Sequence, residues 1–148
     1  MDPDYLELLQ LLNSHKVRYL IIGGYAVINY TEPRYTKDLD LWIDCSITNA
    51  KKTLSALTAF GAPVSNLQAE DLAKPGLIYV FGAPPLRVDI LNRVSGATFN
   101  NAWENKNVIM LDKVKANFVS LAVLKRLKKS ANRPNDLADL DKLNKIRP

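Results

Sequence analysis

Acidic side chains alternate with apolar ones in residues 34–44, RYTKDLDLWID. Aspartate is depleted in β-strands, yet the alternation of a strand would place Asp38 and Asp40 on one face and the neighbouring leucines on the other. Two like charges about 4 Å apart repel by roughly 4 kcal/mol at an effective dielectric constant of about 20, and by about 1 kcal/mol in water. The acidic pair therefore requires either full solvation or a cation.

A second stretch repeats this pattern. In residues 86–91, LRVDIL, Arg87 and Asp89 share one face and three aliphatic side chains share the other. If the two strands are neighbours with their polar faces aligned, Asp38, Asp40 and Asp89 converge. Mg²⁺ prefers such hard oxygen ligands, and two ions about 3.5–4 Å apart can bind both the attacking and the leaving oxygen of a phosphoryl displacement. The acids predict magnesium-dependent phosphoryl chemistry.

A glycine pair precedes these acids. The apolar strand 19–22 ends at Gly23 and Gly24, and residues 26–30 read as a helix. Glycines at a helix start allow backbone N–H groups to approach a phosphate, and the helix dipole favours its charge. Tight turns of this type are also common without a ligand, and the pattern is neither a P-loop nor the three-glycine dinucleotide motif. Its position before Asp-x-Asp is what favours a binding role.

Composition narrows the class of protein. Hydrophobic residues make up 47% and charged residues 24%, as in ordinary globular proteins, and we expect a cytoplasmic location without a membrane span. A single Cys45 and a single His15 argue against zinc clusters and histidine-based catalysis. Residues 112–148 contain ten Lys/Arg and four Asp. This basic tail suits a nucleoside triphosphate or nucleic acid, although a solvated helical face would look the same.

The elements that position these residues follow from hydrophobic periodicity and capping signals. They predict an α+β fold, a mixed β-sheet flanked by α-helices, in one domain over 1–148 with a C-terminal helical segment over about 116–148. Thr48 and Ser120 are the expected helix caps, Gly61 is an expected helix stop, and Trp42 is expected to make a fold contact. The expected helices cover 3–12, 26–30, 49–60, 70–74, 121–129 and 134–146, with a short one near Phe99 and Trp103, and the expected strands cover 19–22, 34–44, 77–81, 86–91 and 107–111.

These motifs, in this order, resemble the nucleotidyltransferase superfamily of the polymerase-beta type. The resemblance rests on IIGGYAVINY, RYTKDLDLWI and LRVDIL, and continues through VSGATFNNAW and LKKSANRPNDLADLDKL. It is closest to the small prokaryotic, toxin-associated members. It implies magnesium-dependent transfer of a nucleoside monophosphate from ATP or another NTP to a hydroxyl, and a place in a toxin–antitoxin system.

The resemblance also implies roles for individual residues. Asp38, Asp40 and Asp89 would bind two Mg²⁺ ions, and Asp89 would be the general base for the acceptor hydroxyl. Gly23 and Gly24 would hold the triphosphate. One departure is the glycine pair itself, because the superfamily commonly has Gly-Ser there.

Further candidates lie beside the acids and in the tail. Lys128 and Arg133 would bind the triphosphate or stabilise charge on the leaving pyrophosphate. Alternatively, the lysines are solvated, and Asp136, Asp139 and Asp141 serve the electrostatics of the helix N-terminus. Arg34 and Thr36 would contact phosphate or order the loop.

Three matters stay open at this point. The acceptor could be an RNA end such as that of tRNA, a partner protein or a small molecule. The domain could instead be a non-catalytic regulator or antitoxin that binds a protein or RNA through its basic tail, with a steep dependence on salt. A one-metal hydrolase would release inorganic phosphate rather than pyrophosphate.

Overall fold

A mixed β-sheet forms the centre of the computed structural model, which describes residues 1–36 and 38–146. The described residues form six strands, in the spatial order β3-β4-β2-β1-β6-β5. β1 is antiparallel to β2 and parallel to β6, while β4 is parallel to β2 and antiparallel to β3. The strands are β1 (Tyr19–Ile22), β2 (Asp38–Ile43), β3 (Ile78–Ala83), β4 (Leu86–Leu91), β5 (Asn107–Leu111) and β6 (Val114–Phe118).

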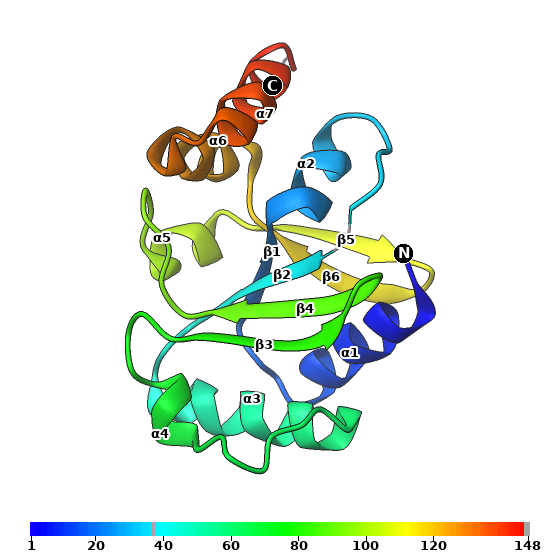
Figure 1. The fold of residues 1–148 in the computed structure, drawn as a ribbon, viewed down its shortest axis with the longest axis vertical. Helices are drawn as coiled ribbons and strands as arrows, with labels where there is room; N and C mark the ends of the chain where they lie inside the picture. The colour runs from blue at the N-terminus through cyan, green and yellow to red at the C-terminus, as the bar shows by residue number, and fades with distance from the viewer. Residues whose placement is uncertain (37, 147–148) are drawn as a thin grey trace.

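Helices cover both faces of this sheet (Figure 1). One side is covered by α1, α3 and α4, and the other by α2, α6 and α7. The α+β class and the mixed sheet predicted from the sequence are confirmed. The helices are α1 (Pro3–Ser14), α2 (Gly23–Tyr30), α3 (Ile47–Phe60), α4 (Ala69–Leu72), α5 (Phe99–Glu104), α6 (Leu121–Ala131) and α7 (Pro134–Asn144).

The core explains why β1 and β2 lie at the centre. All four residues of β1 are buried, as the short apolar run 19–22 predicted. In β2 the leucines that follow the two acids, Leu39 and Leu41, have no exposed surface. Trp42 is buried as well and packs edge-to-face against Phe99 of α5, with ring centroids 5.3 Å apart. Trp42 therefore makes the expected fold contact.

Most helix boundaries follow the capping signals. Ser120 caps α6 through the N–H of Val123, and Gly61 ends α3 in the left-handed region at φ 91°. The prediction of Thr48 as a cap is wrong: Ser46 accepts the N–H of Asn49, so α3 begins earlier.

One strand is absent from the sequence-based prediction. β6 pairs with β5 across Asp112 and Lys113, both of which have positive φ. This is turn geometry that Asn-Gly or Asp-Gly normally signals, and Asp-Lys gives no such signal. As a result the C-terminal helices begin at Leu121, not at about 116.

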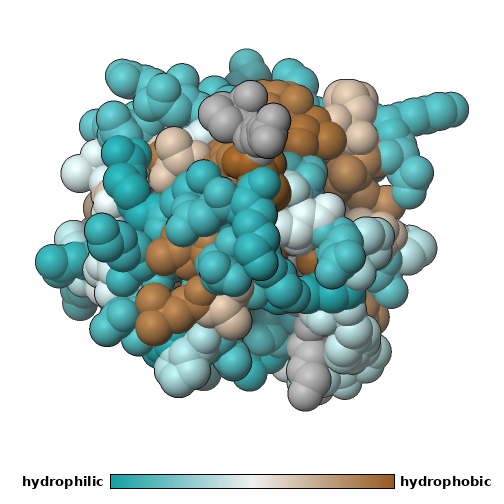
Figure 2. Space-filling view, turned by 90° about the horizontal axis from the view of Figure 1, so that it is seen from above, coloured by the Kyte–Doolittle hydropathy of each residue, from teal (hydrophilic) through white to brown (hydrophobic). Residues whose placement is uncertain are grey.

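Figure 2 shows the face formed by α2, α6 and α7, where hydrophilic residues surround separate hydrophobic patches. Among the described residues, no helix is long and apolar enough to cross a membrane.

Candidate active site

Two carboxylates lie side by side in the middle of the sheet. The parallel register of β2 and β4 pairs Asp40 with Asp89, and Asp38 with Arg87. The polar faces of the two strands are therefore aligned, as the sequence pattern requires for the acids to converge. On its other side Asp40 pairs with Ile22, the last residue of β1 before the glycine turn. The sheet thus brings both acids to the start of α2.

Burial and neighbouring charge together perturb Asp40. Burial is the largest cause that raises the pKa of this carboxyl, and the negative charges of Asp89 and Asp38 add to it. The positive charges of Lys128 and Arg87 act in the opposite direction, and the resulting pKa is about 6 instead of 3.8. Ionised Asp40 is therefore in an unfavourable environment that a cation would relieve.

Asp89 is held by an arginine on its own strand. Arg87 donates from Nε to one oxygen of Asp89 at 2.8 Å and from a terminal nitrogen to the other at 3.2 Å. The two side chains share a face because they are two residues apart in a strand. From the sequence, the two-residue spacing already places Arg87 on the same face as Asp89. The ion pair between the two side chains is seen only in the structure.

The donor chemistry suits a divalent cation, but the side chains are not gathered around one point. The three carboxylates offer the hard oxygens that Mg²⁺ prefers. Within the part of the chain that the structure describes, however, no group of three or more His, Cys, Asp or Glu is arranged to hold a metal ion. Asp89 faces Arg87 instead. A three-carboxylate metal site therefore requires Arg87 to release or share Asp89.

The glycine turn approaches the acids closely. Gly23 has φ 70°, a conformation that favours glycine, and a Cβ atom at this position would collide with the carboxylate of Asp40. A Cβ atom on Gly24 would lie 2.5 Å from the Thr36 hydroxyl oxygen. Both glycines are therefore needed for close approach, one to Asp40 and one to Thr36. Ile22 precedes α2 and has no polar side chain to cap the first N–H groups of the helix.

The C-terminal helices add a network of ion pairs around two buried carboxylates. Lys128 of α6 lies 3.3 Å from Asp136 and 3.1 Å from Asp139, both on α7. Arg34 forms two hydrogen bonds with Asp139, at 2.6 and 3.2 Å. Arg133 donates to Asp136 from Nε at 2.6 Å. Both Asp side chains are over 90% buried, so their charges depend on these cations.

This network refines two predictions made from the tail sequence. Burial opposes ionisation of Asp136 and Asp139, but the cations that they contact outweigh it and lower the pKa of both carboxyls. Asp136 does serve the helix N-terminus, since it accepts the backbone N–H of Arg133. Lys128 is nevertheless only 13% exposed, so it is not a solvated lysine. Arg34 joins the loop before β2 to α7.

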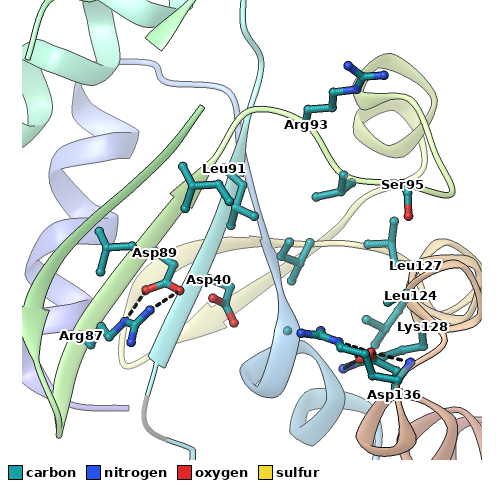
Figure 3. A pocket seen from close by; sticks show the side chains of 17 residues that line it. Asp40, Arg87, Asp89, Leu91, Arg93, Ser95, Leu124, Leu127, Lys128 and Asp136 are labelled. Atoms are coloured by element: carbon teal, nitrogen blue, oxygen red, sulfur yellow. Dashed lines mark hydrogen bonds and ion pairs between the residues drawn. The ribbon is translucent and has the colours of Figure 1, made fainter. Parts of the chain in front are cut away.

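Two clefts meet at Asp40. The larger, of about 1010 Å³, lies between the glycine turn, the loop before β2 and α7. The smaller, of about 470 Å³, lies between β3, β4 and α6 (Figure 3). Every predicted site residue lines at least one of them. Gly24, Arg34, Thr36 and Asp38 line the larger cleft, Asp89 lines the smaller, and both clefts share Gly23, Asp40, Lys128 and Arg133.

Comparison with solved structures identifies the fold. The lincosamide antibiotic adenylyltransferase LnuA, solved with lincomycin bound, matches with a TM-score of 0.61 and 17% identity over 99% of this chain and 98% of its own. An antigenic nucleotidyltransferase-like protein from Paracoccidioides brasiliensis matches with a TM-score of 0.57 and 15% identity over 97% of this chain and 77% of its own. This is a nucleotidyltransferase-like fold.

At the level of sequence, no protein-family model and no curated protein matches this chain. The nucleotidyltransferase-like fold agrees with the superfamily that the motifs resemble. At 15–17% identity the two structures establish the fold, and the chemistry of this chain has to be argued from its own residues.

Proposed function

We propose that the protein transfers a nucleoside monophosphate from an NTP to a hydroxyl acceptor, in a magnesium-dependent reaction. The observation that carries this proposal is the position of Asp40 at the junction of two clefts, with Asp89 beside it. One cleft has the features of a phosphate site, and the other presents a carboxylate that can receive a proton. The nucleotidyltransferase-like fold supports the same chemistry.

The larger cleft is proposed to bind the triphosphate. Gly23 and Gly24 are the first residues of α2, whose N-terminus has no side-chain cap, and N–H groups at a helix N-terminus favour an anion. Thr36 supplies a hydroxyl next to this turn. Lys128 and Arg34 bring positive charge, and their buried partners fix where that charge lies. Charge fixed in advance stabilises a transition state without the cost of reorganisation.

Asp89 is proposed to receive the proton in the transfer step. The acceptor oxygen attacks the α-phosphorus, the bond from this phosphorus to the pyrophosphate oxygen breaks, and the hydroxyl proton passes to Asp89. Asp38, Asp40 and Asp89 would hold Mg²⁺. When bound, the ion would neutralise phosphate charge and favour departure of pyrophosphate. Arg87 orients the Asp89 carboxylate, and Arg133 lies where it can face the leaving group.

The proposal names the acceptor only by its reacting group, a hydroxyl. The adenylyltransferase among the structural neighbours was solved with a small molecule, lincomycin, so a small-molecule hydroxyl stands beside a tRNA end and a protein hydroxyl as an acceptor. Following the superfamily resemblance, the proposed setting is a cytoplasmic toxin–antitoxin system.

Calorimetry tests the proposal directly. ATP, GTP, CTP and UTP are titrated into wild-type protein with and without Mg²⁺, and then into Asp40→Asn. At least one triphosphate should bind only with Mg²⁺, and the variant should lose at least about tenfold in affinity because an anionic ligand is removed. Asp44→Asn is the matched control, since Asp44 lines neither cleft, and it should bind as wild type does.

Product analysis separates transfer from hydrolysis. With the bound triphosphate labelled at the α-phosphate, nucleotidyl transfer releases pyrophosphate and labels the acceptor. Release of inorganic phosphate would instead show a hydrolase. If folded wild-type protein binds no triphosphate at any Mg²⁺ concentration, the proposed function is wrong.

A further inference from the structure

A row of four side chains forms the floor of the smaller cleft. Arg87, Asp89, Leu91 and Arg93 alternate along β4 and its continuation, and all four line this cleft. Residues two apart in a strand share a face, which explains the order of Arg87, Asp89 and Leu91, and Arg93 follows two residues after β4 ends. Figure 3 shows the four side chains in this order, with Arg87 at one end and Arg93 at the other. The floor therefore changes from charged to apolar and back to charged.

The middle of the cleft is aliphatic. Ile78 and Val80 of β3 lie beside Leu91 and Asp89 in the antiparallel register. These two edge-strand residues are 62% and 42% exposed, so a ligand that covers them gains hydrophobic free energy. On the opposite wall α6 contributes further aliphatic side chains, Leu124 and Leu127.

The far end of the cleft has a free positive charge. The other cations that line the cleft, Arg87, Lys128 and Arg133, all form ion pairs. Arg93 is exposed and has no hydrogen bond or ion pair with any described residue. An exposed guanidinium at a cleft end is suited to bind a carboxylate or phosphate in bidentate fashion.

The lining of the cleft argues against a nucleic-acid end. Proteins bind unpaired bases chiefly by stacking them on aromatic side chains. No aromatic residue is among the described residues that line the smaller cleft. Its volume of about 470 Å³ is that of a small-molecule site.

From these observations we infer the class of acceptor: a small molecule with a hydroxyl at one end, an aliphatic body and an anionic group at the other end. This inference rests on the proposed function. The hydroxyl lies at Asp89, the aliphatic body covers Leu91 and Ile78, and the anion binds Arg93. Arg93 follows Asp89 by four positions in the sequence, so even a fully extended chain would place their Cα atoms at most about 13 Å apart.

Three probes of matched length test this class. Uniformly ¹⁵N-labelled protein is titrated with 8-hydroxyoctanoate, 1,8-octanediol and 8-amino-1-octanol, and the shifts of backbone amides are followed. The hydroxy acid should bind about fivefold more tightly than the diol because it adds a charge-assisted contact to Arg93, and the amino alcohol should bind most weakly. The shifts should map to β3, β4 and Arg93.

Variants isolate the contribution of the cation. Arg93→Gln should erase the preference for the hydroxy acid, and because this side chain is exposed the variant should keep the fold. Lys129→Gln removes an exposed charge from α6 outside the cleft, and it should keep the preference. Equal affinity for acid and diol, a preference that survives Arg93→Gln, or no binding of any probe would overturn the inference.

Two further outcomes separate this inference from the proposed function. Probe binding requires neither Mg²⁺ nor NTP, so triphosphate binding by the same sample is measured independently. If the protein prefers the hydroxy acid but binds no triphosphate, the inferred ligand class is supported and the proposed enzymatic function is wrong. A tRNA that displaces bound hydroxy acid and shifts the same amides at lower concentration overturns the small-molecule class.

Discussion

Replacement of Asp40 by asparagine should stabilise the fold while it weakens the proposed cation site. In the wild type, the ionised carboxylate is partly buried beside Asp89 and close to Asp38, and its pKa is raised from 3.8 to about 6. Asparagine keeps the size of the side chain and removes the charge. The variant therefore lacks the repulsion that the native state otherwise contains at neutral pH.

The size and sign of this difference in stability follow from the pKa of Asp40. A carboxyl with a raised native pKa binds its proton more tightly in the native state than in the unfolded chain. The stability that protonated Asp40 contributes is fully present below pH 3.8 and is lost as the pH rises to about 6. Each pKa unit corresponds to about 1.4 kcal/mol, so the full difference is about 3 kcal/mol. With screening by solvent at the open side of the cleft, we expect about 2–3 kcal/mol.

Urea unfolding without divalent cations measures this difference. At about pH 7.5 Asp40→Asn should be the more stable protein by about 2–3 kcal/mol, and its advantage should shrink as the pH falls to about 4.5. Asp44→Asn, away from both clefts, should change the free energy of unfolding by less than about 1 kcal/mol at pH 7.5. Mg²⁺ should stabilise the wild type and leave Asp40→Asn unchanged. A variant that is less stable than wild type at pH 7.5, or an advantage independent of pH, would refute the reasoning.

Two other substitutions test neighbouring contacts. Arg87→Gln releases Asp89 and should tighten Mn²⁺ or Mg²⁺ binding about tenfold in calorimetry, because a cation next to the site is lost. Lys129→Gln is the control for the loss of one positive charge. Unchanged or weaker metal affinity in Arg87→Gln contradicts the idea that Arg87 competes with the metal. Gly24→Ser should displace Thr36 and lower triphosphate affinity about tenfold. Gly24→Ser combined with Thr36→Ala should recover most of that affinity, because the two residues are coupled. An equal loss of affinity in the single and the double variant argues against competition of the two side chains for the same space.

The carboxylates could be predicted from the sequence because strand alternation is a local rule. Two residues of separation place Asp38 with Asp40, and Arg87 with Asp89, whatever the rest of the fold does. What alternation cannot provide is the pairing of the two strands, since register between strands depends on the whole sheet. The structure supplies it by pairing Asp40 with Asp89.

The buried ion pairs show the limit of local patterns. Arg34 and Asp139 are 105 residues apart in the sequence, and no sequence pattern next to either residue predicts the contact. In sequence, Asp139 is one of several acids on an amphipathic helix, where solvation is the ordinary expectation. Only the packing of α7 against α6 and the loop before β2 removes water from it and makes Arg34 and Lys128 its partners.

The glycine pair departs from the motif that it resembles, and a residue of another segment lies beside it. Where the superfamily commonly has serine, this chain has Gly24, and a Cβ atom there would lie 2.5 Å from the hydroxyl oxygen of Thr36. Thr36 thus places a hydroxyl in the space that a serine side chain would enter, and it lines the same cleft. The two residues belong to different segments that meet only when β2 pairs with β1. In the proposed function the hydroxyl that binds phosphate thus stands at position 36 instead of position 24, and a motif compared along the chain shows only the loss of the serine.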